Sequence, residues 1–100
     1  MAYIDPCEVS PDNYTLRHET DGVKVIEMWL PAGEKDIEHS HHNEFVYFIT
    51  GGKARVHVGG DAVDLEIPDG HFMEHEPWTH VVENVGDTDI HAIIFELKPQ

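Results

Sequence analysis

The stretch GEKDIEHSHHNEFVYFITG, residues 33–51, carries the strongest signal in this sequence. Its first half holds three clustered histidines, His39, His41 and His42, and its second half is a continuous apolar run over residues 45–50. Side chains two residues apart on a β-strand project from the same face, so His39 and His41 point to one side. Neutral imidazole is a good ligand for divalent transition metals. The pattern therefore predicts a strand that directs two metal ligands into a β-barrel.

Two further residues can complete a set of ligands around this histidine pair. Glu44 follows a short turn and begins the next strand, so a hairpin would bring its carboxylate opposite the two imidazoles. His80 lies much later in the chain and can close the set from another strand. Three histidines and one carboxylate leave open positions on the ion, which is typical of a reactive metal site. His42 points away from its neighbours in a regular strand and is the alternative ligand if Glu44 is too far from the ion.

The remainder of the chain is a series of short strands separated by Gly and Pro turns, with no segment of helical periodicity. After a polar arm that we expect to be extended, residues 1–13, the predicted strands cover residues 14–19, 23–30, 45–50, 54–58, 62–67 and 90–97. The last of these is nearly all apolar, so we expect it to be buried on both faces. About eight or nine strands at this spacing indicate an all-β sandwich or barrel, and a double-sheet jelly roll suits a chain of this size.

The composition excludes several classes of partner. The sequence has 20 acidic and 6 basic residues, which give a formal net charge of −14. Six scattered basic residues cannot form the basic surface that binding to nucleic acid or an anionic membrane requires. Cys7 is the only cysteine, which rules out a disulfide within the chain. The first residues lack the basic start and apolar run of a signal peptide, and no apolar stretch approaches the ~20 residues that cross a bilayer. We expect a cytoplasmic protein with a small-molecule substrate or ligand.

Beyond the residue chemistry, two motifs resemble those of the cupin superfamily. The first cupin motif combines Gly, His-x-His, Glu and Gly at nearly the spacing found here, which is Gly33-x5-His39-x-His41-x2-Glu44-x6-Gly51. The second ends in His-x3-Asn, and residues 70–84 resemble it with His80 and Asn84 at the end. Two departures stand out: the family usually has three or four residues before the Glu, and Pro77-Trp78-Thr79-His80 replaces Pro-x-Gly-x2-His.

The resemblance implies both a fold and a set of metal ligands. It implies a double-stranded β-helix, the jelly-roll barrel of the cupins, as a single domain over residues 14–100. In that family the two histidines, the glutamate and the later histidine bind one divalent transition metal ion, and these roles fall on His39, His41, Glu44 and His80. The ion implied is Fe, Mn, Ni, Zn or Cu, and the sequence does not choose among them.

A substrate pocket is expected next to these ligands. By strand alternation Val46 and Phe48 share the face of Glu44, and Met73 and Trp78 lie near His80 in the sequence pattern. His75 alternates with Met73 and is our candidate for a catalytic acid or base.

The family resemblance leaves three functional interpretations open. The chain is either a dioxygenase-like enzyme, or an isomerase or lyase that uses the metal as a Lewis acid, or a binding protein without catalysis. Cupins commonly pair, and the N-terminal arm and the apolar strand over residues 90–97 offer surface for a homodimer.

Overall fold

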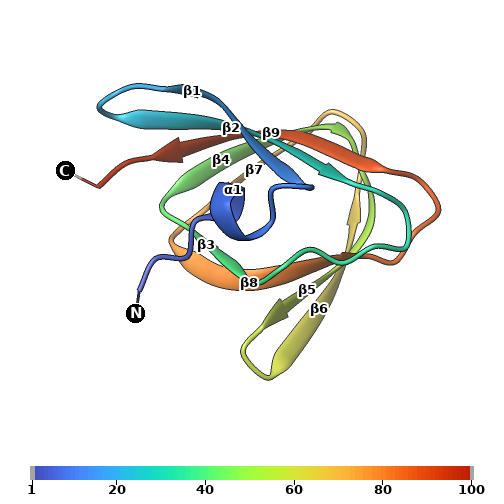
Figure 1. The fold of residues 1–100 in the computed structure, drawn as a ribbon. Helices are drawn as coiled ribbons and strands as arrows, with labels where there is room; N and C mark the ends of the chain where they lie inside the picture. Colours follow the sequence, from blue (N-terminus) through green and yellow to red (C-terminus); the bar gives the residue numbers. More distant parts are fainter. Residues whose placement is uncertain (1, 100) are drawn as a thin grey trace.

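The computed structural model describes residues 2–99, which form two antiparallel sheets packed face to face and one short helix (Figure 1). The five-stranded sheet has the order β1-β2-β9-β4-β7, and the four-stranded sheet has the order β3-β8-β5-β6. The elements are α1 (Pro6–Val9), β1 (Tyr14–Glu19), β2 (Val23–Leu30), β3 (His39–His41), β4 (Glu44–Thr50), β5 (Gly52–Val58), β6 (Asp61–Ile67), β7 (His71–His75), β8 (Trp78–Asn84) and β9 (Ile90–Leu97). The predicted all-β architecture is confirmed.

The core lies between the two sheets, and strand alternation decides which residues enter it. Buried and more exposed side chains alternate along most of β2, β4 and β9, and the buried apolar members of these three strands are Ile26, Met28, Leu30, Val46, Phe48, Ile90, Ala92 and Ile94. Removing apolar surface from water contributes roughly 25 cal/mol per Å², so this shared inner layer holds the sheets together. The same alternation also turns some polar side chains toward the interior, such as Glu44 on β4 and Glu96 on β9.

One expectation about β9 is wrong. The strand is not buried on both faces, since Phe95 and Leu97 are each 38% exposed. The reason is its place in the five-stranded sheet, whose outer face is not covered by another layer of residues 2–99. Trp29, Tyr47 and Phe72 are exposed on neighbouring strands. Exposed apolar patches of this kind often mark contact surfaces, and the homodimer stays a prediction.

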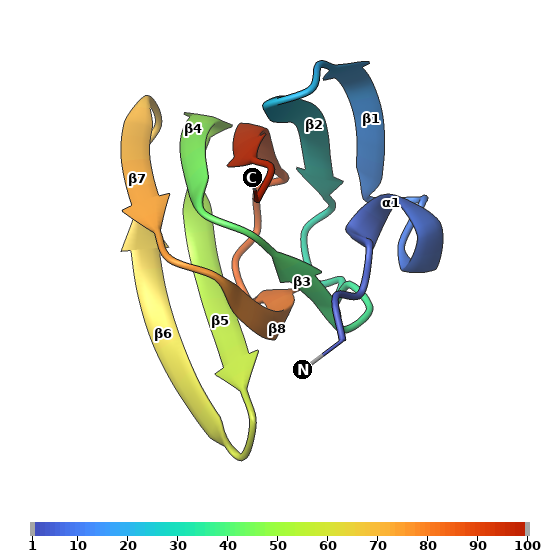
Figure 2. The same ribbon diagram turned by 90° about the vertical axis from the view of Figure 1, so that its left-hand side faces the viewer.

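The N-terminal segment also differs from the expected extended arm. Residues 6–9 form one helical turn, with Pro6 at its start and the Asp5 side chain accepting a hydrogen bond from the Cys7 amide at 2.9 Å. Before the helix, the Ile4 carbonyl accepts a hydrogen bond of 2.7 Å from the amide of Ser40. The segment is therefore attached to β3 of its own chain (Figure 2). No helix among residues 2–99 is long and apolar enough to span a membrane.

The predicted hairpin between His41 and Glu44 is absent. Strand β3 pairs with β8, whereas β4 pairs with β7 and β9 in the other sheet. The two residues between β3 and β4 carry the chain from one sheet to the other. Glu44 consequently faces the interior from the sheet opposite to that of the histidines.

Gly51, at the end of the histidine-containing stretch, is required by a close backbone approach. A Cβ at this position would lie 1.9 Å from the Ile67 carbonyl oxygen. We expect Gly51→Ala to lower the free energy of unfolding by about 1–3 kcal/mol, because the backbone after β6 must shift to admit the methyl group. Denaturant unfolding measures this change. Gly60→Ala is the control, since a Cβ there meets nothing within 4 Å; equal losses in both variants would contradict this explanation.

Candidate metal centre

Three histidines meet on the inner face of the four-stranded sheet. The antiparallel register of β3 and β8 places His39 directly opposite His80 and His41 opposite Trp78. One nitrogen atom from each of His39, His41 and His80 lies within 4.8 Å of the others. The three side chains are buried, with exposed fractions of 0%, 3% and 5% respectively. The structure therefore brings together the three histidines that the sequence pointed to.

The spacing of these nitrogens suits a single ion. The Nε2 atoms of His39 and His80 are 3.1 Å apart. Two nitrogen ligands that are each ~2.0–2.1 Å from an ion in tetrahedral geometry lie ~3.4 Å apart, so the observed distance is close to that of a ligand pair. The Nδ1 atom of His80 is buried and has no hydrogen-bond partner, which leaves part of this ring's polarity unsatisfied within the protein.

The protonation of the cluster also fits a metal. Burial, reinforced by the neighbouring His41, lowers the pKa of His39 to about 4. Burial and the two other histidines lower the pKa of His80 to about 2. Both rings are therefore neutral at pH 7, which is the form of imidazole that binds a metal. Position, spacing and charge of the donors together fit a divalent transition metal ion.

Hydrogen bonds hold two of the rings in a defined tautomer. His39 donates from Nδ1 to the Ile37 carbonyl at 2.7 Å, and His41 donates from Nδ1 to Oε1 of Glu96 at 2.8 Å. An Nδ1–H tautomer leaves the Nε2 lone pair available for an ion. Glu96 was not identified from the sequence, although an acidic residue at an inward position of the apolar strand β9 was a visible signal.

Glu44, which the sequence predicts as a fourth ligand, lines the same cavity as His41 and His80 but forms a hydrogen bond with Trp78. Among the described residues, the group able to hold an ion consists of the three histidines alone. The Glu44 carboxylate accepts a hydrogen bond of 2.6 Å from the Trp78 indole. Burial holds its pKa above the usual range, and the charge of Glu96 adds to this effect. A role for Glu44 as a ligand stays a prediction. The alternative ligand, His42, is outside the cluster and stacks on the Tyr3 ring with centroids 4.3 Å apart.

An apolar cavity adjoins the histidines. The cavity is small, with a volume of about 50 Å³, and the titratable groups of its wall are Tyr14, His41, Glu44 and His80. The four residues predicted for a substrate pocket all line it, namely Val46, Phe48, Met73 and Trp78. Within the described part of the chain, residues 2–99, no lysine or arginine lines the cavity. A mostly apolar cavity with a few convergent polar groups is typical of a small-molecule site.

His75 does not line this cavity. Its ring stacks on that of Trp78 with centroids 3.6 Å apart, and its Nδ1 donates to the Glu76 carbonyl at 2.6 Å. Trp78 in turn packs edge-on against His80, with centroids 4.1 Å apart. A catalytic role for His75 stays a prediction, and the contact that the structure gives it is with the indole of Trp78.

Tyr14 and Asp36 support the cluster and were not identified from the sequence. The Tyr14 ring packs on His39 with centroids 4.6 Å apart, and its hydroxyl donates to Oδ2 of Asp36 at 2.6 Å. The Val82 amide donates to Oδ1 of Asp36 at 2.7 Å. Burial raises the pKa of Asp36 to about 6, although these hydrogen bonds oppose the effect. Asp36 thus connects β1, the segment before β3, and β8, and no local sequence pattern reveals such a long-range connection.

We expect Tyr14→Phe to lower the free energy of unfolding by about 1–3 kcal/mol, because it leaves a buried carboxylate without one of its donors. The matched control is Tyr47→Phe, which removes the hydroxyl of a tyrosine that is 41% exposed on the outer sheet face. Denaturant unfolding of both variants measures the difference. The explanation is contradicted if the two substitutions have equal effects.

Similarity to known proteins is found in the structure. No model of a protein family matches this sequence, and no curated protein matches it. A cupin domain from Bordetella pertussis Tohama I is similar in structure, with 25% identity, a TM-score of 0.78, and coverage of 86% of this chain and 92% of that one.

Two more distant structures share the arrangement of strands. An RmlC-like cupin family protein with a double-stranded β-helix fold from Methanocaldococcus jannaschii is 13% identical, with a TM-score of 0.67 and coverage of 84% of this chain and 77% of that one. A DMSP lyase from Ruegeria pomeroyi DSS-3 is 21% identical, with a TM-score of 0.59; the match covers 88% of this chain and 48% of that one. These matches confirm the double-stranded β-helix as the fold.

Proposed function

Because this chain has the double-stranded β-helix fold of the cupins, we propose that it binds one divalent transition metal ion through His39, His41 and His80 and acts on a small organic molecule in the adjoining cavity. The observation that carries the proposal is the convergence of three buried imidazoles, which each bring one nitrogen within 4.8 Å of the others, and of which His41 and His80 line an apolar cavity. A lone buried histidine is usually structural. Three buried histidines that converge in this way favour a set of metal ligands, and burial lowers the pKa values of two of them, His39 and His80.

The residues around the proposed ion have separate tasks. A bound metal would supply positive charge and open coordination positions for the reacting molecule. The apolar walls exclude water from those positions, which strengthens electrostatic interactions in the cavity. Trp78 holds the Glu44 carboxyl group at the wall by its indole N–H. With its pKa raised, Glu44 is suited to hold or transfer a proton to a molecule in the cavity.

The lining of the cavity restricts the class of substrate. Phosphate groups and multiple carboxylates are usually bound by arginine or lysine side chains, and none lines this cavity. Glu44 and the overall net charge of −14 further disfavour polyanions. We therefore propose an uncharged or weakly charged small molecule, held by apolar contacts and oriented by the metal.

Metal analysis tests the binding proposal. Purified wild-type protein is expected to retain close to one divalent transition metal ion per chain, and the double variant His39→Ala/His41→Ala is expected to lose it, because one imidazole alone holds an ion weakly. The control is His57→Ala/His91→Ala, which removes two histidines that each pair with a glutamate outside the cluster. Retention of the metal by the His39/His41 variant would exclude this site.

Among the possible reactions we favour dioxygenase-like oxidation, with isomerase or lyase chemistry as the second candidate. The raised pKa of Glu44 supports the second candidate, since eliminations and isomerisations need proton transfer. A lyase is also among the proteins of similar fold, although this chain spans less than half its length.

Oxygen uptake by iron-loaded protein distinguishes these reactions. We expect uptake with at least one substrate from a panel of small diketones, thiols and enols, and none with the His39→Ala/His41→Ala variant. Absence of uptake across the panel would contradict the oxidation proposal and favour Lewis-acid chemistry or simple binding.

Two further proposals concern the state of the protein in the cell. We expect a homodimer, since the outer face of the five-stranded sheet is apolar and uncovered. We also expect a cytoplasmic location. Light scattering coupled to size exclusion measures the first, and a monomeric mass would contradict it.

A further inference from the structure

Glu96 is an unusual residue for its position. It occupies an inward position on β9, in the same alternating row as Ile90, Ala92 and Ile94, and its exposed fraction is 0%. Its partner across the strands is Glu44, another buried carboxyl group. Burying a carboxylate is costly unless it is fully hydrogen-bonded, and an apolar side chain of similar size would stabilise the fold at least as well. Packing alone therefore does not account for a glutamate here.

Both carboxylate oxygens of Glu96 are occupied by strong donors. Oε1 accepts the hydrogen bond from Nδ1 of His41 at 2.8 Å, and Oε2 accepts one from the Tyr3 hydroxyl at 2.6 Å. Two donors on its two oxygens are the arrangement that stabilises the carboxylate form of a glutamate. The neighbouring Glu44 accepts a hydrogen bond from the Trp78 indole instead.

The charge of Glu96 acts on one specific ligand. A carboxylate that accepts the Nδ1–H of a histidine fixes the ring orientation, leaves Nε2 as the lone pair, and makes that nitrogen a stronger donor to a metal. His39 donates from Nδ1 to a backbone carbonyl at 2.7 Å, and the Asp36 carboxylate lies 3.8 Å from this nitrogen, beyond hydrogen-bond distance. His80 has no hydrogen-bond partner at Nδ1 among residues 2–99. Of the three rings, His41 is therefore the one whose Nδ1 donates a hydrogen bond to a carboxylate in the described part of the chain.

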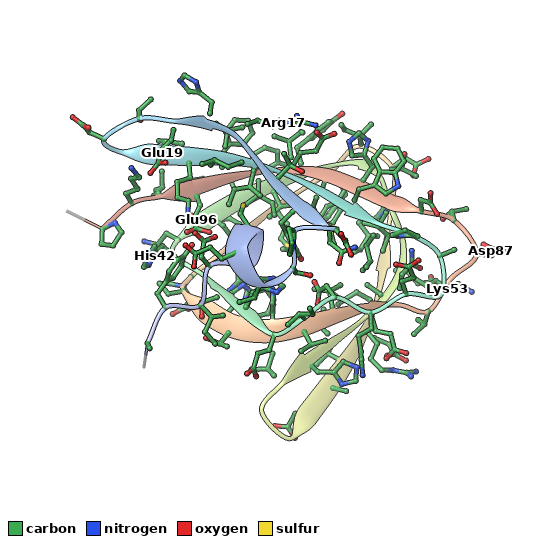
Figure 3. The ribbon with its side chains drawn as sticks, viewed as in Figure 1. Arg17, Glu19, His42, Lys53, Asp87 and Glu96 are labelled. Atoms are coloured by element: carbon green, nitrogen blue, oxygen red, sulfur yellow. The ribbon has the colours of Figure 1, made fainter. Side chains whose placement is uncertain are left out.

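Tyr3 connects this carboxylate to the N-terminal segment. Its ring stacks on His42, and the Lys24 ammonium lies 5.3 Å from the centroid of the same ring. Lys24 also pairs with Asp5 at 3.6 Å. Figure 3 shows Glu96 and His42 at the end of the barrel beside α1, away from Lys53 and Asp87 at the other end. The segment before α1 thus contributes a hydroxyl group to the surroundings of the metal centre.

We propose that Glu96 is the positioning residue of the metal centre, which acts through His41, and that the Tyr3 hydroxyl holds Glu96 in place from the N-terminal segment. This inference rests on the proposed metal binding by the three histidines. It assigns a role in metal affinity to two residues that lie outside the ligand set, one of them in a segment outside the barrel strands.

The test compares metal dissociation constants of folded variants, measured for Zn²⁺ by competition with a chromophoric chelator. Glu96→Gln retains the size of the side chain but removes the charge, and we expect it to weaken binding about 10–100-fold. Tyr3→Phe removes one hydroxyl group and is expected to weaken binding by a smaller factor. In the double variant the effect of Tyr3→Phe should disappear, because Tyr3 acts through Glu96.

A matched control exists on the opposite face of the same sheet. Glu27 accepts a hydrogen bond of 2.6 Å from Nε2 of His91, but this pair lies outside the three-histidine cluster. Glu27→Gln should leave Zn²⁺ affinity unchanged. Nitrogen-15 NMR of the metal-free protein gives a second measurement, which does not depend on metal loading. His41 should be the Nδ1–H tautomer in the wild type and should lose this preference in Glu96→Leu, because leucine offers the Nδ1–H no acceptor.

The possible results distinguish the role of Glu96 from the proposed metal binding by the three histidines. Wild-type protein that does not bind Zn²⁺ would contradict both. Tight binding by wild type and by folded Glu96→Gln alike would overturn the role of Glu96 and leave the metal site intact. If Glu96→Gln does not fold, two other measurements test the inference. An Nε2–H tautomer of His41 in the wild-type protein would overturn it, and so would a Zn²⁺ affinity of Tyr3→Phe equal to that of the wild type.

Discussion

The pairing of β3 with β8 is the constraint on which the rest of this structure depends. His39 and His80 are direct partners in that antiparallel ladder, and His41 is opposite Trp78. A shift of β3 by one residue against β8 would turn Ser40 toward the interior and His39 and His41 away from it. In the observed register Ser40 and Thr79 share a hydrogen bond of 2.8 Å. The register therefore decides at once whether the histidines converge, whether Trp78 lines the cavity, and whether Glu44 has its indole donor.

Burial of so many titratable groups has a cost, and the arrangement of partners offsets it. His39 and His80 are kept neutral, because burial lowers their pKa values, while Glu96 and Asp36 each receive two hydrogen bonds from donors on other segments. Polar networks of this kind are stable only when nearly every member is satisfied. Among residues 2–99, the buried side-chain polar atom without a hydrogen-bond partner is Nδ1 of His80, which belongs to the cluster that we assign to the metal. The side chains that form the buried hydrogen-bond network are therefore also those that form or support the proposed metal site.

Strand alternation and motif spacing were sufficient to identify the fold, the three histidines and the apolar lining, because these depend on local periodicity. The parts that were missed depend on long-range contacts. Glu44 was expected across a hairpin, and it lies in the opposite sheet because the chain crosses between sheets after His41. Glu96 is 55 residues away from His41 in the chain, and Tyr3 is 93 residues from Glu96. The helix over residues 6–9 was missed because one turn is too short to show periodicity.

The central claim is that His39, His41 and His80 hold one metal ion. Anomalous diffraction from crystals loaded with Zn²⁺, recorded on both sides of the zinc absorption edge, tests it most directly. We expect a single strong anomalous peak per chain, within ~2.0–2.2 Å of one nitrogen atom from each of the three rings. A strong peak bound elsewhere on the chain, or no peak between these three imidazoles at saturating metal, would contradict it.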